Sequence, residues 1–300
     1  MLTGVCKRDD LIAIVAPSSP FNKKLLLDAI TKMEEHGFKF IYNERIFERS
    51  WEMIDYLVGS PQERAKEIMQ YFKNPKVKVI IAARGGYGAN LVAEYLDYDL
   101  ISKNPKIFVG FSDLTFLLNA INKNSKLTTF HGPMLGSYRF LSMSEFDFNL
   151  LISVLKNPLF NIITSFNLDD IMNPESIEGT IIGGNLTLLT NLLGTSYDVS
   201  YKNKILFIED TNEPPYKIHR SLVHLKQAGK FDSVKAIIFG EMLACGVNSK
   251  ILFDILEKLQ VKVPILTNFP AGHGERNVII PIGGSCTIDI DSKKILMRGC

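Results

Sequence analysis

Three times in its first 130 residues the chain runs from a short apolar segment through a loop into a segment of helical periodicity. The apolar segments are residues 11–16, 77–83 and 107–109. Each has the length and composition of a buried strand, and apolar residues recur at helical spacing after it. Strands that alternate with helices in this way favour parallel pairing, with helices covering both faces of the sheet.

The pattern changes after residue 155. Residues 156–178 lose the periodicity and contain two Asn-Pro pairs, so we expect a linker there. Strands and helices return over residues 179–300, and 300 residues suit two domains. The predicted division is a domain at 1–155, the linker, and a domain at 179–300. The fold class expected is α/β, with an N-terminal doubly wound, mostly parallel sheet of the Rossmann-like kind and a smaller C-terminal mixed α/β domain.

Composition excludes several classes of partner. Lys and Arg number 34 against 32 Asp and Glu, a net charge of +2 that gives no electrostatic case for nucleic acid or an anionic membrane. The four cysteines are scattered and no histidine stands at metal-ligand spacing, so neither a metal nor a disulfide framework is indicated. The first apolar run stops at Pro17, too short for a signal or a membrane span. We expect a cytoplasmic protein without a cofactor.

A single serine occupies the bend of Val109-Gly110-Phe111-Ser112-Asp113, between a strand-like run and a helical segment. A hydroxyl at such a turn stands clear of the sheet, and the first amides of the helix point at whatever the hydroxyl attacks. The turn resembles a nucleophile elbow but lacks its second glycine. From these residues alone, Ser112 is either a nucleophile or a helix N-cap.

A glycine-rich loop, Arg84-Gly85-Gly86-Tyr87-Gly88, follows the apolar segment at 77–83. Its glycines either let backbone amides approach a ligand or serve a tight turn that needs positive φ. A dinucleotide fingerprint fails here because no third glycine or alanine stands in register.

Two histidines sit beside glycine in loops that follow apolar runs, where chemistry is usually placed. His273, between two glycines, is the better candidate base, and His131 either binds substrate or shapes the rim. Glu209 ends an apolar strand and is placed to orient His273, although pairing with Arg220 or simple hydration is the alternative. The order Ser112, Glu209, His273 is a known order for catalytic triads.

These residues resemble the LD-carboxypeptidases of serine peptidase family S66, which also contains the microcin C immunity proteins. The resemblance spans most of the chain and rests on eight segments in one order: Ile14-Val15-Ala16-Pro17-Ser18-Ser19, Arg84-Gly85-Gly86-Tyr87-Gly88, Val109-Gly110-Phe111-Ser112-Asp113, Thr129-Phe130-His131-Gly132-Pro133, Gly183-Gly184-Asn185-Leu186, Phe207-Ile208-Glu209-Asp210, Pro214-Pro215-Tyr216-Lys217-Ile218-His219-Arg220 and Gly272-His273-Gly274.

The resemblance implies a metal-free Ser–Glu–His hydrolase that releases terminal D-alanine from muropeptides during cell-wall recycling. Ser112 would be the nucleophile, Glu209 the orienter and His273 the base, with the amides of Asp113 and Gly86 as the oxyanion hole. A homodimer is implied as well. The remaining substrate-binding candidates are Gly85, Arg84 and His131, of which Arg84 could instead form a structural ion pair.

Two rivals stay open. A microcin-immunity-like hydrolase of peptidyl nucleotides should need an aromatic platform in the second domain, whereas the one tryptophan, Trp51, lies in the first. A non-catalytic peptide-binding module is favoured if the triad fails to assemble. His219 and Glu241 depart from the aspartates expected in many relatives, which could alter packing or substrate contacts.

Overall fold

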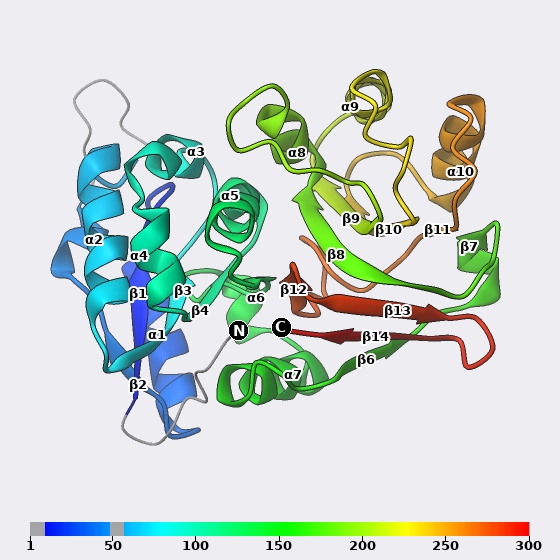
Figure 1. The fold of residues 1–300 in the computed structure, drawn as a ribbon. Coiled ribbons are helices and arrows are strands. Elements are labelled where there is room, and N and C mark those ends of the chain that lie inside the picture. The colour runs from blue at the N-terminus through cyan, green and yellow to red at the C-terminus, as the bar shows by residue number, and fades with distance from the viewer. Residues whose placement is uncertain (1–9, 49–56, 300) are drawn as a thin grey trace.

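The computed structural model describes residues 10–48 and 57–299. Figure 1 shows two sheets lying side by side, each with its own helices, and the second sheet is strongly curled. The α/β class predicted from the sequence is confirmed. So is the parallel character of the first sheet.

Within the described residues the first sheet has six strands in the order β12-β5-β4-β3-β1-β2. Strand β12 is antiparallel to β5, and the other neighbours are parallel. An order of 2-1-3-4-5 is that of a doubly wound sheet, in which ligands collect at the strand carboxyl ends near the switch between β1 and β3. The strands are β1 (Leu11–Val15), β2 (Lys39–Ile41), β3 (Val77–Ala82), β4 (Ile107–Gly110), β5 (Thr129–His131) and β12 (Ile280–Ile282).

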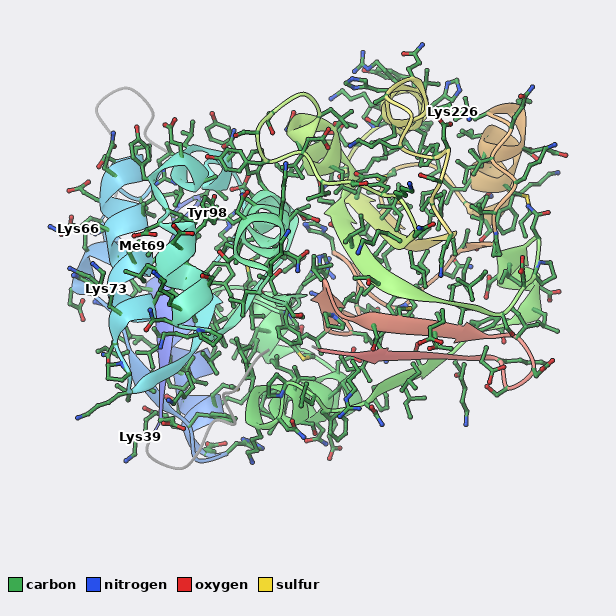
Figure 2. The ribbon with its side chains drawn as sticks, viewed as in Figure 1. Lys39, Lys66, Met69, Lys73, Tyr98 and Lys226 are labelled. Atoms are coloured by element: carbon green, nitrogen blue, oxygen red, sulfur yellow. The ribbon has the colours of Figure 1, made fainter. Side chains whose placement is uncertain are left out.

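The helices of the first half include one after each of β1, β3 and β4, as the alternation predicts. They are α1 (Lys23–Glu34), η1 (Glu44–Phe47), α2 (Pro61–Lys73), α3 (Ala89–Val92), η2 (Ala93–Tyr95), α4 (Tyr98–Lys103), η3 (Ser112–Leu114), α5 (Thr115–Ser125), α6 (Tyr138–Leu141) and α7 (Glu145–Lys156). Ser60 and Glu63 form a capping box at the start of α2. The same helix turns Lys66 and Lys73 to solvent (Figure 2) and buries Phe72.

The second sheet has eight strands within the described residues, in the order β6-β14-β13-β8-β9-β10-β11-β7. Its centre, from β8 to β11, is parallel, and its flanking pairs are antiparallel. None of the helices in residues 10–48 and 57–299 is long and apolar enough to cross a membrane. The elements are β6 (Ile162–Ser165), η4 (Leu168–Asp170), β7 (Ile171–Met172), β8 (Ile177–Asn185), α8 (Leu186–Leu192), β9 (Lys204–Thr211), α9 (Pro215–Gln227), β10 (Ala236–Leu243), α10 (Ser249–Lys258), β11 (Ile265–Leu266), β13 (Ser285–Asp289) and β14 (Lys294–Arg298).

The two halves exchange segments. Residues 156–178, expected to be a linker, contain β6 and β7, which form the two edges of the second sheet. In return, β12 leaves the C-terminal half and pairs with β5 of the first sheet, with Ile280 opposite His131. The irregular sequence of 156–178 therefore reflects short edge strands as well as a connection between halves. The domain boundaries at 155 and 179 stay predictions.

The halves also meet where α5 crosses the end of β8. The Asn185 amide donates to Thr115 Oγ1 at 2.9 Å, and Asn119 Nδ2 donates to the Gly183 carbonyl at 2.9 Å. Gly184 has φ +139°, and a Cβ there would lie 2.5 Å from Thr115 Oγ1. Glycine at this position therefore permits the close approach of the helix that follows Ser112 to the second sheet.

Candidate active site

Ser112 lies at the predicted turn between strand and helix. Strand β4 ends at Gly110, and Ser112 opens η3, which leads into α5. Its φ of +62° is left-handed, a conformation that costs a non-glycine residue about 1–2 kcal/mol. The N-cap position of η3 is Phe111, which makes no side-chain capping bond. Ser112 is therefore not an N-cap, and a strained backbone presents its hydroxyl at the turn.

The three residues predicted to act together are in hydrogen-bond contact. Ser112 Oγ lies 2.9 Å from His273 Nε2, and His273 Nδ1 lies 2.6 Å from Glu209 Oε2. The Glu209 side chain is fully buried and that of His273 is 18% exposed. Arg220, the alternative partner of Glu209, is exposed on α9 instead. In space the hydroxyl of Ser112, the imidazole of His273 and the carboxylate of Glu209 therefore form one hydrogen-bonded line.

Two opposing effects set the pKa of His273. Burial acts to lower the pKa, but the hydrogen bond and the charge of Glu209, together with the charge of Asp210, outweigh burial and raise the pKa above its ordinary value. With Nδ1–H donated to Glu209, the neutral ring keeps Nε2 as an acceptor for the Ser112 hydroxyl. The ring is therefore oriented and made more basic at once.

Asp210, the neighbour of Glu209, faces another direction. Its carboxylate accepts hydrogen bonds from Asn185 Nδ2 at 2.9 Å, from the amide and hydroxyl of Thr187 at 3.0 Å each, and from the Thr211 amide at 2.8 Å. Burial raises the pKa of this carboxyl group. Asp210 therefore ties β9 to the start of α8, and Glu209 alone reaches His273.

The glycine-rich loop lies directly against the turn at Ser112. A Cβ on Gly85 would come within 3.1 Å of Ser112 Cβ and 3.3 Å of the Phe111 carbonyl oxygen. Gly86 is exposed, has φ +113° and leaves no room for a side chain beside Ser19. The loop is thus pressed against the serine through backbone atoms, which is the arrangement that brings amides close to a reacting group.

Buried side-chain contacts that the sequence patterns did not predict hold this loop in place. The Asp113 carboxylate accepts from Ser18 Oγ at 2.6 Å and from the Ala89 amide at 2.8 Å. Arg64, which is 1% exposed, donates to the carbonyls of Pro17 and Gly88. Burial lowers the Arg64 pKa to about 10, an effect that the nearby Asp113 carboxylate opposes. The loops after β1, β3 and β4 are therefore fastened together around Ser112.

The other two substrate-binding candidates have different surroundings. Arg84 is exposed and donates from Nη1 to the Pro20 carbonyl at 2.7 Å, which is neither the predicted ion pair nor a buried contact. His131 is 0% exposed, packed against Phe111 and Phe207 with ring centroids 5.6 and 5.0 Å away. Burial lowers its pKa to about 3. A ring so enclosed offers no surface to a substrate, so His131 shapes the interior of the rim.

Two arginine side chains join the loop that carries His273 to helices of the first half. Arg139 of α6 donates to the Gly274 carbonyl, and Arg276 donates from Nε and Nη2 to Asp147 of α7 at 2.7 and 2.8 Å. Gly274 also passes so close to the Glu241 carboxylate that a Cβ would collide with it. The glycines around His273 therefore allow close packing of the loop, in addition to leaving the imidazole ring accessible.

A small cavity of about 20 Å³ adjoins the loop of His273, and it is lined by Phe111, Met134, Gly272 and other residues of that rim. Next to it opens a larger cavity of about 790 Å³, bounded by Tyr138, Arg139 and Gly274 among others. Together they give the region beside His273 the space that a peptide would need.

Two cysteines lie in the described part of the chain. Cys245 and Cys286 are free and buried, and burial raises the pKa of Cys286 to about 12, so its thiol is a poor nucleophile. Among residues 10–48 and 57–299, no group of three or more His, Cys, Asp or Glu side chains is arranged to hold a metal ion.

The fold consists of two α/β units, and the line of contacts from Ser112 through His273 to Glu209 lies where they meet. Residues 12–132 match the LD-carboxypeptidase N-terminal domain and residues 178–288 match the LD-carboxypeptidase C-terminal domain. The chain belongs to the LD-carboxypeptidase family, as the sequence motifs indicated.

Individual relatives cover nearly the whole chain. The probable murein peptide carboxypeptidase of Bacillus subtilis is 34% identical, over 97% of this chain and 92% of its own. The muramoyltetrapeptide carboxypeptidase of Oxalobacter formigenes superposes with a TM-score of 0.82 at 30% identity, over 96% of this chain and 99% of its own. The microcin C7 self-immunity protein MccF, solved with aspartyl sulfamoyl adenosine, gives a TM-score of 0.87 at 26% identity, over 100% and 99%.

Proposed function

We propose that this protein is a serine-type LD-carboxypeptidase that hydrolyses the L,D peptide bond before a terminal D-alanine in murein tetrapeptides. The observation that carries the proposal is the continuous contact from Ser112 through His273 to the buried Glu209, at 2.9 and 2.6 Å. A buried carboxylate on one nitrogen of an imidazole and a strained serine on the other is the arrangement that acyl transfer requires. The carboxypeptidase relatives support the same reaction class.

In the first half of the reaction, Ser112 Oγ attacks the carbonyl carbon of the scissile bond while His273 Nε2 takes the hydroxyl proton. The carbonyl π electrons move to oxygen. His273 then returns the proton to the departing amine of D-alanine as the C–N bond breaks, which leaves an acyl-enzyme on Ser112. Water, deprotonated by the same ring, attacks this ester, and the proton returns to Ser112. Glu209 stays ionised throughout and stabilises the protonated ring.

The amides of Asp113 and Gly86 are assigned as the oxyanion hole. Asp113 follows the nucleophile in η3, where the first amides have no carbonyl partner one turn earlier. Gly86 belongs to the loop that packs against Ser112 through Gly85. Each such donor typically contributes roughly 3 kcal/mol of transition-state stabilisation. The anchoring of Asp113 by Ser18 and of the loop by Arg64 keeps both donors in place before the substrate arrives.

Binding of the substrate's terminal carboxylate is assigned to Arg84 and to the amides around Gly85. Arg84 is exposed and donates from Nη1 to the Pro20 carbonyl; within the described residues its other guanidinium nitrogens make no hydrogen bond, which leaves them able to meet a carboxylate. The same proposal places the reaction in cell-wall recycling in the cytoplasm, carried out by a homodimer.

The second candidate is hydrolysis of a peptidyl nucleotide, and the similarity to MccF favours it. Such a substrate should need an aromatic side chain on which its nucleobase can stack. Trp51, the one tryptophan of the sequence, lies outside the described residues. The larger cavity beside the loop of His273 has Tyr138 at its edge, 70% exposed, as the aromatic side chain available there.

Mass spectrometry of products from a small substrate panel separates these candidates. The panel contains a tetrapeptide ending in a diamino acid and D-alanine, the same peptide ending in L-alanine, and aspartyl sulfamoyl adenosine. We expect loss of alanine from the first peptide and none from the second. Cleavage of the nucleotide alone would assign the protein to the second candidate, and no cleavage of any member would leave a binding module.

A further inference from the structure

Strand β10 contains a bulge where it runs beside Glu209 of β9. Between Phe239 and Met242 its register with β9 shifts, with three steps along β10 against two along β9. Gly240 and Glu241 lie in the shifted segment. A bulge unpairs part of a strand and redirects its side chains, often next to an active site. Glu241 is therefore available to bond outside the sheet.

The backbone of Glu241 bonds to the loop that carries His273. Its amide donates to the Ala271 carbonyl at 2.9 Å. A Cβ on Gly240 would collide with the same carbonyl oxygen, so glycine at that position permits the close approach. The loop is thus attached to the bulge just before His273.

The side chain of Glu241 reaches the same loop just beyond His273. Both of its carboxylate oxygens lie against Gly274, since a Cβ there would overlap each of them. Burial raises the pKa of this carboxyl group, and hydrogen bonds from the backbone amides of Gly274 and Arg276 oppose that effect. One residue of β10 therefore contacts the loop on both sides of His273.

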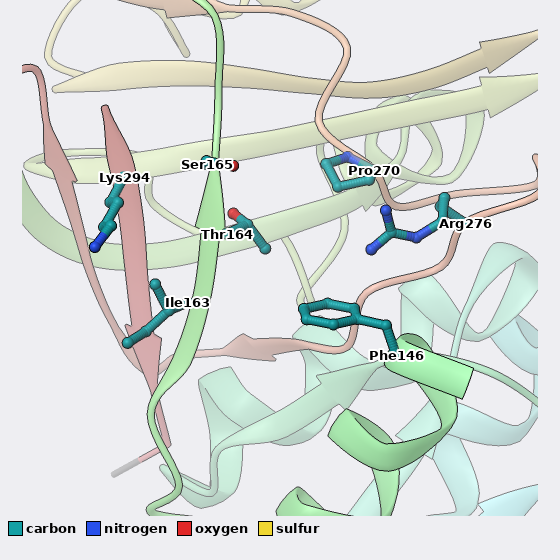
Figure 3. A pocket seen from close by; sticks show the side chains of 7 residues that line it. All are labelled: Phe146, Ile163, Thr164, Ser165, Pro270, Arg276 and Lys294. Carbon is teal, nitrogen blue, oxygen red and sulfur yellow. The ribbon is translucent and has the colours of Figure 1, made fainter. Parts of the chain in front are cut away.

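Two arginines hold the same loop from the other side. Arg139 of α6 donates to the Gly274 carbonyl, and its charge favours the ionised form of Glu241. The guanidinium carbon of Arg276 lies 5.2 Å from the centre of the Phe146 ring on α7 (Figure 3). The loop is therefore anchored to the first half by Arg139 and Arg276, and to the second half by Glu241.

We propose that Glu241 is a positioning residue for the predicted base. By holding residues 271–276, it fixes the ring of His273 within hydrogen-bond reach of Ser112 and Glu209 at once. A displacement of about 1 Å can reduce a catalysed rate about a hundredfold, so a fixed loop matters for the rate. Glu241 acts through His273 and not on the substrate. The inference rests on the proposed role of His273 as the base.

Three variants of the full chain separate the effect of the carboxylate from that of side-chain size. Glu241→Gln keeps the size but loses the charge and replaces one acceptor oxygen by a donor group. Glu241→Asp keeps the carboxylate on a side chain one methylene shorter. Glu178→Gln is the matched control, since Glu178 is exposed on β8 of the same sheet.

NMR of the protein with 15N-labelled histidine reports on the ring of His273 without any substrate. The two ring 15N shifts of a neutral histidine show which nitrogen carries the proton, and contact with Glu209 at 2.6 Å should keep it on Nδ1. We expect the shifts to move toward those of a free ring with mixed tautomers in Glu241→Gln. They should stay near the native values in Glu241→Asp and be unchanged in Glu178→Gln.

Turnover of the D-alanine-terminated tetrapeptide gives the second measurement. In Glu241→Gln, kcat should fall by about 10–100-fold while KM stays within about twofold, because the contacts to substrate remain. Glu241→Asp should lose less activity than Glu241→Gln. Circular dichroism melts establish that each variant is folded, and Glu241→Ala takes the place of Glu241→Gln if the latter does not fold.

Three results would overturn the proposal. The first is a set of ring shifts unchanged in Glu241→Gln, and the second is a native ring that already shows mixed tautomers. The third is a larger loss of kcat in Glu241→Asp than in Glu241→Gln, since the size of the side chain would then matter more than its carboxylate. If the native protein does not hydrolyse the tetrapeptide, the proposed function fails, but the NMR comparison still decides the role of Glu241.

Discussion

His273 Nε2 lies 2.9 Å from Ser112 Oγ, although 161 positions separate the two residues in the chain. Ser112 follows a strand of the first sheet, and His273 follows a strand of the second. The contact therefore depends on how the two halves pack against each other. The packing of α5 on β8 and the clamps on the loop of His273 are what fix that seating.

Gly184→Ala should loosen the seating of the halves. Its Cβ would lie 2.5 Å from Thr115 Oγ1, and φ is +139°, so both overlap and backbone strain oppose alanine. We expect a loss of about 2–4 kcal/mol in the free energy of unfolding, measured by urea denaturation. Gly194→Ala is the control, because φ there is +74° with nothing within 4 Å, so only strain of about 1 kcal/mol applies. Equal losses in the two variants would contradict the packing argument.

Glu209→Gln should move the acid limb of the pH–rate profile. In the proposed mechanism activity should rise with pH as His273 loses its proton, and Glu209 raises the pKa of that ring against the effect of burial. Without the carboxylate charge the burial effect remains, so the midpoint of kcat/KM against pH shifts to lower pH. The plateau should also fall by about 10³-fold because the ring loses its orienting anion.

The raised pKa of His273 also makes the stability of the fold depend on pH. A proton held more tightly by folded His273 stabilises the fold below the unfolded pKa, and this contribution disappears as pH rises through the folded pKa. Glu209→Gln should abolish it. If the variant kept the native midpoint in both the rate profile and the ring titration followed by NMR, Glu209 would not be the group that sets the basicity of His273.

Ser112→Gly should be more stable than Ser112→Ala, although alanine is usually the more stabilising of the two residues. Both remove the hydroxyl, but φ is +62°, where alanine is strained and glycine is not. We expect the glycine variant to be more stable than the alanine variant by about 1 kcal/mol in urea denaturation. An alanine variant that equals or exceeds the glycine variant would mean that the turn is relaxed.

His131→Phe should remove an acid sensitivity of the fold. The folded pKa of His131 is lowered to about 3 by burial, below the unfolded value near 6.5, so the unfolded chain binds more protons between these limits. The native protein therefore loses roughly 1.4 kcal/mol for each pH unit below about 6.5, or about 2 kcal/mol by pH 5. Urea midpoints at pH 7 and pH 5 measure this loss. A variant that loses as much as the native protein would show that another group titrates.

Local patterns in the sequence predicted the elements that carry the site. The alternation of apolar runs and helical segments gave the parallel sheet, and the run into Gly110 followed by leucines at helical spacing placed Ser112 at a turn. These features depend on neighbours a few residues away, which is why a single sequence contains them.

The contacts that hold the site together could not be predicted in this way. In the sequence, Arg64 is one of several charged residues of a helical segment. In the structure it is buried against the carbonyls of Pro17 and Gly88 because three loops converge there. Likewise, β12 reads as another short strand of the second domain, but it pairs with β5 of the first sheet. Each depends on how distant segments meet, and no local pattern encodes that.

Turnover of the D-alanine-terminated tetrapeptide by Ser112→Ala, followed by mass spectrometry, tests the central claim most directly. The account predicts that release of alanine falls by about 10⁴-fold or more while the circular dichroism spectrum is unchanged, because the hydroxyl that forms the acyl-enzyme is gone. Release at a rate within tenfold of the native protein would contradict the claim, since the reaction would then proceed without the serine.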